Sequence, residues 1–313
     1  MSVKSHFKYS KPAILFLAAR PKFLVASAAP ILVGSSLGYA VTGDFSPVLF
    51  ILALLAIMSL HCGANVANDY FDHISGNDWV NKNPTPFSGG RRYIQQAILS
   101  PKTTLMICFL WLTIGSIIGV IILLLTQSIF ILILGLAGLL GGFFYTAPPV
   151  QFGYRCAGEI VIALLFGLFP VYGSYYLQTN TIDLIPLLPA AIVGILIFLV
   201  ILINEFPDLQ ADAIVNKRTL VVIFGARISI RIYMIVMAAG YVIAAAMLIF
   251  HSTFYAGLFY LFTLPAAIVA MRFVTKEDLT RPGQYHASQI TVLVHSLGAL
   301  ALTAGFITSG LLL

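Results

Sequence analysis

A cluster of amide and carboxylate side chains ends one of the long apolar stretches of the chain. It consists of Asn65, Asn68, Asp69 and Asp72. At about 100° per residue these positions fall within one arc of roughly 100° on a helix, so their side chains share a face. Carboxylates this close repel one another unless a cation joins them. The pattern indicates a cation site, although a polar helix end wetted by interfacial water would also show these residues.

A second polar cluster follows another apolar run much later in the chain. It consists of Asn204, Glu205, Asp208 and Asp212, with Pro207 between them. Proline removes a helical hydrogen bond, so we expect the helix to kink or unwind there and to free backbone carbonyls. Oxygen donors from both clusters suit Mg²⁺ rather than Zn²⁺. The carboxylates of the two clusters together carry more negative charge than one bare ion needs. Their number favours a site in which Mg²⁺ ions bridge the protein to a diphosphate.

Basic groups that could contact such an anion lie near both clusters. The candidates are Lys82, Arg91, Arg92, Arg155, Lys217 and Arg218. The Ser88-Gly-Gly turn before Arg91 could offer backbone N–H groups to phosphate oxygens, with arginine as a bidentate partner. Taken alone, these residues would equally fit the ordinary excess of positive charge on cytoplasmic links. Tyr145, between the clusters, is a candidate both for the site and for an aromatic belt at the membrane interface.

The elements that position these residues must be membrane helices. Of the 313 residues, 60% are hydrophobic and only 9% are charged, and the mean hydropathy is +0.99. A soluble domain normally carries about 25% charged residues. Apolar runs of about 20 residues recur, and each could cross a hydrocarbon core roughly 30 Å thick. The composition therefore predicts an all-α, polytopic membrane protein in contact with the lipid bilayer, and no nucleic-acid partner.

We predict nine spanning helices in a single domain that covers residues 1–313. They run over residues 23–41, 48–70, 104–125, 129–144, 158–177, 185–206, 228–250, 254–273 and 289–308.

The charges predict how these helices are oriented. All 17 Lys and Arg residues fall in the N-terminal segment, in alternate links, or at the helix ends that border them, while the other links carry only Asp44 and Asp183. Positive residues near helix ends stay cytoplasmic. We therefore expect the N-terminus in the cytoplasm and the C-terminus outside a cytoplasmic membrane. Both acidic clusters then lie at the cytoplasmic face, where they can meet.

Other sequence signals are negative. The cysteines, Cys62, Cys108 and Cys156, are odd in number and lack CxxC spacing, so neither a disulfide framework nor a zinc site is expected. The basic start followed by a short apolar stretch could suggest a signal peptide, but Arg20-Pro21-Lys22 interrupts it and no cleavage site follows.

Together, the motifs resemble the UbiA family of intramembrane prenyltransferases. The resemblance spans nearly the whole chain. It rests on Arg20-Pro21, NDYFD (68–72), YTAPP (145–149) and NEFPDLQAD (204–212). The segments SGGRR (88–92), GYRCAGE (153–159) and YYLQT (175–179) resemble the branch that prenylates 1,4-dihydroxy-2-naphthoate in menaquinone synthesis. The family usually has a third Asp in the first motif; here Gly76 stands at that position, with Asp78 two residues later.

The resemblance implies nine helices around a central chamber that opens to lipid, and Mg²⁺-dependent transfer of a polyprenyl group. The donor would be a polyprenyl diphosphate and the acceptor an aromatic ring, most simply 1,4-dihydroxy-2-naphthoate. The expected metal ligands are Asp69, Asp72, Asp208 and Asp212, assisted by Asn65, Asn68 and Asn204. The six basic candidates and the three asparagines would contact substrate, and Tyr145 would belong to the catalytic site. Whether Asp78 or Glu205 joins the metal site is left open.

Other functions also fit some of these features. Within the prenyltransferases, 4-hydroxybenzoate, homogentisate, haem or a glycerol lipid could be the acceptor. A cation-coupled transporter would also place carboxylates in a membrane, but it predicts them near mid-membrane with access from both sides. A scaffold that has lost catalysis would not need both Asp motifs intact.

Overall fold

The computed structural model describes residues 11–312, and within that range the chain is helical, without strands. The predicted cytoplasmic N-terminal segment at residues 1–10 lies outside the described residues. The α-helices are α1 Lys11–Ala18, α2 Val25–Thr42, α3 Pro47–Ile74, α4 Asn77–Val80, α5 Pro101–Thr126, α6 Ile129–Phe144, α7 Gly158–Ala163, α8 Phe169–Thr179, α9 Leu187–Glu205, α10 Leu209–Ile214, α11 Leu220–Met247, α12 Phe254–Leu261, α13 Leu264–Lys276 and α14 His286–Leu312. Short 3₁₀ turns, η1 Pro21–Phe23, η2 Phe152–Tyr154 and η4 His251–Thr253, and the π-helical segment η3 Leu164–Leu168 connect them.

Seven stretches of the described chain are long and apolar enough to cross a membrane. The pair α12 and α13 could form an eighth crossing, but it is bent by 50° at the break after Leu261. The sequence predicted a single spanning helix over 254–273. α6 is apolar but has only 16 residues, shorter than the other candidates. α11 starts eight residues earlier than predicted, at Leu220, and is broken at Gly225, whose φ is 73°. The chain is therefore a multi-pass membrane protein.

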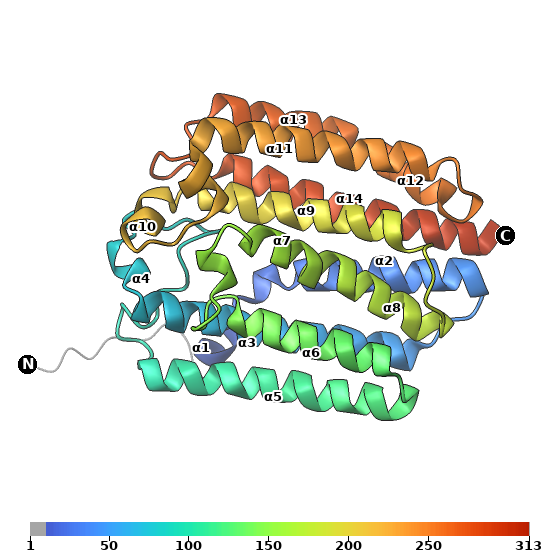
Figure 1. The fold of residues 1–313 in the computed structure, drawn as a ribbon, viewed down its shortest axis with the longest axis horizontal. Helices are drawn as coiled ribbons and strands as arrows, with labels where there is room; N and C mark the ends of the chain where they lie inside the picture. The colour runs from blue at the N-terminus through green and yellow to red at the C-terminus, as the bar shows by residue number, and fades with distance from the viewer. Residues whose placement is uncertain (1–10, 313) are drawn as a thin grey trace, which may run out of the picture.

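The long helices lie side by side along the long axis of the molecule (Figure 1). α5 forms one side and α11 with α13 the other, while α2, α8, α9 and α14 lie between them. The short helices α4 and α10 gather at one end of the bundle, and α14 ends at the other. Links at the end that carries α4 and α10 are the longer, polar ones. This arrangement brings segments that are far apart in sequence to one end of the molecule.

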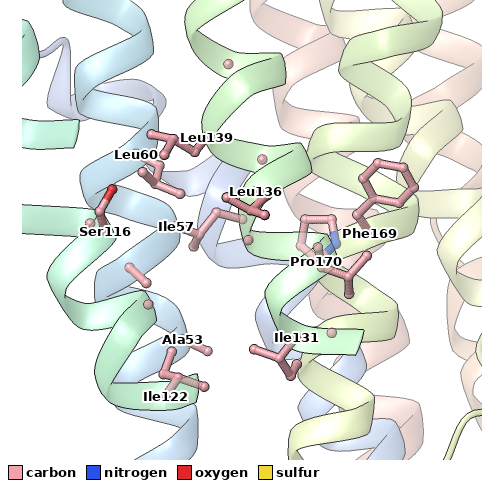
Figure 2. Close-up of a pocket in the computed structure, with 18 of the residues that line it drawn as sticks. Ala53, Ile57, Leu60, Ser116, Ile122, Ile131, Leu136, Leu139, Phe169 and Pro170 are labelled. Carbon is pink, nitrogen blue, oxygen red and sulfur yellow. The ribbon is translucent and has the colours of Figure 1, made fainter. Parts of the chain in front are cut away.

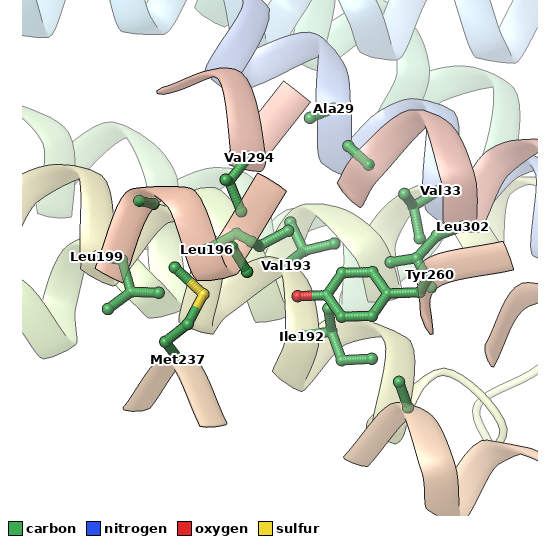
Figure 3. Close-up of a cluster of buried hydrophobic side chains, with 14 of the residues drawn as sticks. Ala29, Val33, Ile192, Val193, Leu196, Leu199, Met237, Tyr260, Val294 and Leu302 are labelled. Carbon is green, nitrogen blue, oxygen red and sulfur yellow. The ribbon is translucent and has the colours of Figure 1, made fainter. Parts of the chain in front are cut away.

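The main hydrophobic core fills the half of the bundle around α9. Leu196 and Leu199 of α9 pack with Met237 of α11 and Tyr260 of α12 (Figure 3). All four side chains are buried. Lipid is as apolar as these side chains, so the hydrophobic effect does not drive helices together inside a membrane. The contact is favourable because the side chains pack closely against one another. The core thus holds α9 rigidly, and with it the second acidic cluster at its end.

A glycine allows α2 to pack closely against α8. A Cβ on Gly34 would overlap the Ser174 hydroxyl oxygen and the backbone carbonyl of Val171. Small residues at a helix interface let two backbones approach, which is how membrane helices gain packing energy. By contrast, a Cβ on Gly119 of α5 would meet no atom within 4 Å.

Gly34→Ala is expected to destabilise the protein by about 1–3 kcal/mol, because the added methyl group overpacks the interface between α2 and α8. Gly119→Ala is the matched control, since both glycines lie within long helices and alanine has the higher helix propensity. Thermal unfolding of the two variants in detergent measures the difference. Equal melting temperatures for both variants would contradict the close approach described here.

Candidate functional site

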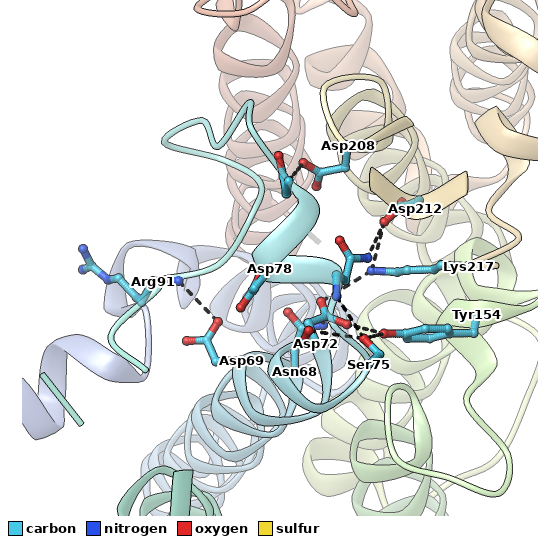
Figure 4. A network of polar contacts seen from close by, with 12 residues as sticks. Asn68, Asp69, Asp72, Ser75, Asp78, Arg91, Tyr154, Asp208, Asp212 and Lys217 are labelled. Carbon is cyan, nitrogen blue, oxygen red and sulfur yellow. Dashed lines mark hydrogen bonds and ion pairs between the residues drawn. The ribbon is translucent and has the colours of Figure 1, made fainter. Parts of the chain in front are cut away.

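The two acidic clusters meet at the end of the bundle that carries α4 and α10 (Figure 4). The first cluster lies on the last turns of α3, and Asp208 and Asp212 lie at the N-cap and within α10. α4 bridges them, because the Asn77 side-chain amide donates to Asp212 Oδ1 at 2.7 Å and the Asn81 amide donates to Asp208 Oδ1 at 2.8 Å. The predicted convergence of the clusters is therefore what the structure shows.

A single ammonium group joins carboxylates from both clusters. Lys217 Nζ lies 3.5 Å from Asp72 Oδ2 and 3.7 Å from Asp212 Oδ1. The lysine side chain is 15% exposed. Burial alone would lower the pKa of Lys217, but the carboxylates of Asp212 and Asp72 raise it well above its ordinary value. Lys217 is thus a fixed positive charge between the two clusters.

Asp72 accepts hydrogen bonds from two further side chains. The Tyr154 hydroxyl donates to Oδ1 at 2.7 Å, and the Asn68 amide donates to Oδ2 at 3.0 Å. Burial, together with the neighbouring charge of Asp72, raises the pKa of Tyr154 above its ordinary value, so the phenol remains a donor. These contacts fix the orientation of the Asp72 carboxylate.

Asp69 faces a different cation. Arg20, which directly precedes η1, forms an ion pair with Asp69 and also donates to Asn68 Oδ1 at 3.2 Å. Burial would lower the pKa of Arg20, and the adjacent Asp69 outweighs this and raises it. The backbone N–H of Arg91 donates to Asp69 Oδ1 at 3.3 Å. The predicted Ser88–Gly90 turn closes over this carboxylate, since a Cβ on Gly90 would lie 2.8 Å from Asp69 Oδ1.

Asp78 lies in the same cluster. Gly76, at the position where the resembled family has a third Asp, adopts a φ of 84° and turns the chain into α4. This turn buries Asp78, which accepts a hydrogen bond from Gln95 at 3.0 Å. Burial and the nearby Asp72 and Asp69 raise the pKa of Asp78 to about 7.

Asp208 also lies near other carboxylates, among them that of Asp212. Burial and the adjacent Asp212 raise its pKa to about 7. Burial and neighbouring carboxylates thus disfavour the charged form of both Asp78 and Asp208.

The donors present fit a hard divalent cation. Carboxylate and amide oxygens are the ligands that Mg²⁺ prefers. The Asn204 side-chain oxygen is buried without a hydrogen-bond partner in the described chain, so it too could accept a ligand. Within residues 11–312, however, no three His, Cys, Asp or Glu side chains form a ready metal centre. Arg20 and Lys217 occupy the carboxylates instead, so a metal ion must share or replace their contacts.

Glu205 and Glu159 both contact the start of α11. Glu205 Oε2 accepts the backbone N–H of Val221 at 3.3 Å, and Glu159 Oε1 accepts that of Leu220 at 2.8 Å. Both glutamates therefore cap the N-terminus of α11, where the helix dipole favours negative charge. These contacts hold the start of α11, directly after the segment that carries Lys217.

The other predicted residues lie around the cluster with different contacts. Asn65 donates to the backbone carbonyl of Ala19 at 3.1 Å, so it fixes the approach to η1. Arg92 donates to the carbonyl of Asp78 at 2.7 Å, and Arg91 Nε to that of Leu17 at 3.0 Å.

Three other basic candidates have no described contact with the acidic residues of the site. Arg155 is exposed and donates to the carbonyls of Val150 and Pro149 in its own link. Lys82 and Arg218 are exposed.

Tyr145 follows α6 directly and lies close to the cluster. A Cβ on Gly153 would lie 2.8 Å from its ring, so Gly153 lets the link fold against the phenol. Desolvation, with Glu205 and Glu159 nearby, raises the pKa of Tyr145 above its ordinary value.

Two cavities adjoin this cluster. A polar one of about 150 Å³ is lined by Arg20, Lys22, Ser88 and Arg91, next to the Asp69 ion pair. An apolar one of about 270 Å³ lies between α3, α5, α6 and α8 (Figure 2). Its lining reaches Ala64 of α3, five residues and about 7.5 Å along the helix from Asp69. The polar cavity can therefore hold an anion, and the separate apolar cavity can hold an apolar chain.

The contacts of Asn77, Asn81 and Tyr154 were not predicted from the sequence. The first two are four residues apart around Asp78, a spacing that places both on one helical face. That spacing was the available signal. For Tyr154 we find none.

Comparisons with known proteins agree with the motifs. Residues 27–309 match the family described as the UbiA prenyltransferase family. The chain is 32% identical to the 1,4-dihydroxy-2-naphthoate octaprenyltransferase of Haemophilus influenzae, over 92% of this chain and 94% of the relative. It is 25% identical to the 2-carboxy-1,4-naphthoquinone phytyltransferase of Synechocystis, over 95% of this chain and 94% of the relative.

The fold is similar to solved structures. A UbiA homolog from Archaeoglobus fulgidus bound to DMAPP and Mg²⁺ superposes with a TM-score of 0.70, covering 94% of this chain and 99% of that chain at 15% identity. A structure of the same homolog bound to GPP and Mg²⁺ also gives a TM-score of 0.70. At this identity the likeness concerns the fold.

Lys217→Met is expected to destabilise the metal-free protein by about 3 kcal/mol, because it leaves Asp72 and Asp212 without their shared cation. Mg²⁺ should then raise the melting temperature of the variant more than that of the wild type. Lys102→Met, at an exposed position on α5, is the control. If Lys217→Met melts like the wild type in EDTA, the ammonium does not neutralise the two carboxylates.

Proposed function

The chain belongs to the UbiA prenyltransferase family, and on this premise we propose that it transfers a polyprenyl group from a polyprenyl diphosphate to 1,4-dihydroxy-2-naphthoate. The relatives support a naphthalene-type acceptor, because the names of both the octaprenyltransferases and the phytyltransferase contain one. Their prenyl groups differ, so the proposal leaves the chain length open. The observation that carries it is the cluster in which Lys217 contacts carboxylates of both motifs, with an apolar cavity a short way along α3.

Mg²⁺ is the proposed cofactor, held by Asp69, Asp72, Asp208 and Asp212, with Asn68 and Asn204 as further oxygen donors. Bound there, the metal would neutralise the diphosphate as it leaves. The solved homolog bound to DMAPP and Mg²⁺ supports this for the fold. Asp78, buried in the same cluster, is a further candidate ligand.

The basic side chains would stabilise the negative charge that develops on the leaving diphosphate. Arg20, Lys22 and Arg91 line the polar cavity, and the Ser88–Gly90 turn closes it. Preorganised donors of this kind stabilise a transition state because they need no reorientation as charge develops. Lys217 would act from the other side of the cluster. Lys82, Arg92, Arg155 and Arg218 stay predicted contacts at the outer rim.

The apolar cavity would receive the first part of the prenyl chain. Its walls are almost entirely hydrocarbon, from Ala64 near the carboxylates to Ala53 and Ile122 further down (Figure 2). Such a lining excludes water, which would otherwise capture the allylic cation that forms when the C–O bond breaks. The electron-rich ring carbon of the acceptor is then the available nucleophile.

A transporter is less consistent with this arrangement. Its cation site should be accessible from both sides of the membrane. The carboxylates of Asp69, Asp72, Asp208 and Asp212 instead gather at one end of the bundle.

We further propose that α6 and the bent α12–α13 pair also cross the membrane, which gives nine crossings around a chamber open to lipid. The carboxylate end would face the cytoplasm, with the N-terminus inside and the C-terminus outside. The split of positive charge between the two sets of links supports this orientation.

Asp69→Asn and Asp208→Asn are each expected to lower the rate of prenyl transfer at least about 100-fold, since each removes a charge from the metal and diphosphate site. Excess EDTA should abolish transfer in the wild type, and Mg²⁺ should restore it. Purified protein, a labelled polyprenyl diphosphate and a panel of aromatic acids measure this. Asp44→Asn, exposed in the link between α2 and α3, is the control. Full activity of either site variant would contradict the metal role.

Cys156 tests the orientation, because it is exposed in the link after α6 whereas Cys62 and Cys108 are buried. In intact cells a membrane-impermeant maleimide should leave Cys156 unlabelled, and it should react after the membrane is opened. Thr181→Cys, exposed at the opposite end, should label in intact cells when Cys156 is replaced by Ser. The reverse pattern would mean that the carboxylates face outward.

A further inference from the structure

His61 is a polar side chain on the wall of the apolar cavity, well inside α3. It lies seven residues, or about 10 Å along the helix, from Asn68. At 100° per residue it shares a helical face with Asn65, Asn68 and Asp72. The same face of α3 therefore presents the carboxylate cluster at its end and an imidazole deeper in the cavity.

Two contacts from other helices fix the imidazole. The Ser27 hydroxyl of α2 lies 2.6 Å from His61 Nδ1, and Ser27 is fully buried. The ring of Phe166 packs edge-on against it, with centroids 4.7 Å apart and planes at 72°. Phe166 belongs to the π-helical segment η3, and such segments occur frequently at functional sites. With Nδ1 engaged, the imidazole can offer only Nε2 to the cavity.

Nothing in the described chain satisfies that second nitrogen. Among residues 11–312, no side chain or backbone group hydrogen-bonds His61 Nε2. The cavity lining includes the apolar side chains of Leu60, Ala64 and Leu139. On the facing helix α6, a Cβ on Gly138 would meet no atom within 4 Å. Gly138 also lines the cavity, so this part of its wall carries no side chain.

The chemistry of the two substrates decides which of them His61 contacts. A prenyl chain has no hydrogen-bonding group, so packing it against Nε2 would leave a desolvated polar atom unpaired, which is unfavourable. A hydroxylated aromatic acid has oxygens that can pair with an imidazole nitrogen in either tautomer. We propose that His61 binds a ring oxygen of the aromatic acceptor and so places the acceptor beside the start of the prenyl chain. This inference rests on the proposed function and names the acceptor-binding group of that site.

Replacement of His61 by the two side-chain amides tests the role of each nitrogen. Gln can place its amide near the position of Nε2, whereas Asn can keep only the contact with Ser27. His61→Asn is expected to raise the KM for the aromatic acceptor roughly 10-fold or more, with the KM for the polyprenyl diphosphate unchanged. His61→Gln should recover most of the acceptor affinity. Ser27→Ala should raise the acceptor KM by a smaller factor, because the imidazole is then less well oriented. His251→Gln, exposed at the opposite end of the molecule, is the control for a lost histidine.

Each outcome separates this inference from the proposed function. An acceptor KM that rises in His61→Asn and recovers in His61→Gln supports the hydrogen bond. An unchanged acceptor KM in both variants, with an active wild type, overturns the role of His61 alone. A rise confined to the KM for the polyprenyl diphosphate overturns it as well, and assigns His61 to the prenyl chain. If the wild type transfers no prenyl group to any aromatic acid, the proposed function and this inference both fail.

Discussion

The concentration of negative charge at one end of the bundle is the constraint that the surrounding structure must satisfy. Carboxylates from α3, α4 and α10 lie near one another in a partly desolvated site, where like charges repel strongly. Lys217 and Arg20 offset part of this repulsion through ion pairs. Asn77 and Asn81 add neutral donors between the clusters. Ionisable groups are costly in a membrane protein, and where they occur they usually mark a functional site.

The helices below the site serve two opposite packing demands. Close contact between α2 and α8 at Gly34, and the core around α9, make the scaffold rigid. Around the apolar cavity, glycine instead leaves space. A Cβ added to Gly119 or Gly138 would meet no atom within 4 Å. Glycine therefore allows close packing between α2 and α8 and leaves free space at the apolar cavity. The two cases differ in whether the backbone of a neighbouring helix lies against the glycine.

The sequence was sufficient to predict those features that depend on hydropathy and on the distribution of charge. These include the helical membrane class, the approximate position of each long helix, and the meeting of Asp69 and Asp72 with Asp208 and Asp212. The bend between α12 and α13 and the bridge formed by α4 could not be predicted, because they depend on contacts between segments that leave no periodic pattern. The capping role of Glu205 was equally hidden. Its place within an acidic motif left a role at the metal site open, and its contact with Val221 depends on where α11 begins.

The capping of α11 also links two parts of the molecule mechanically. Glu205 is the last residue of α9, and Glu159 lies in the first turn of α7. Both accept hydrogen bonds from consecutive backbone N–H groups of α11. A tilt of α11 would therefore pull on the segment that carries Asp208 and Asp212, and on Lys217 just before it. Because the helix is broken at Gly225, this link involves only the first turn of α11.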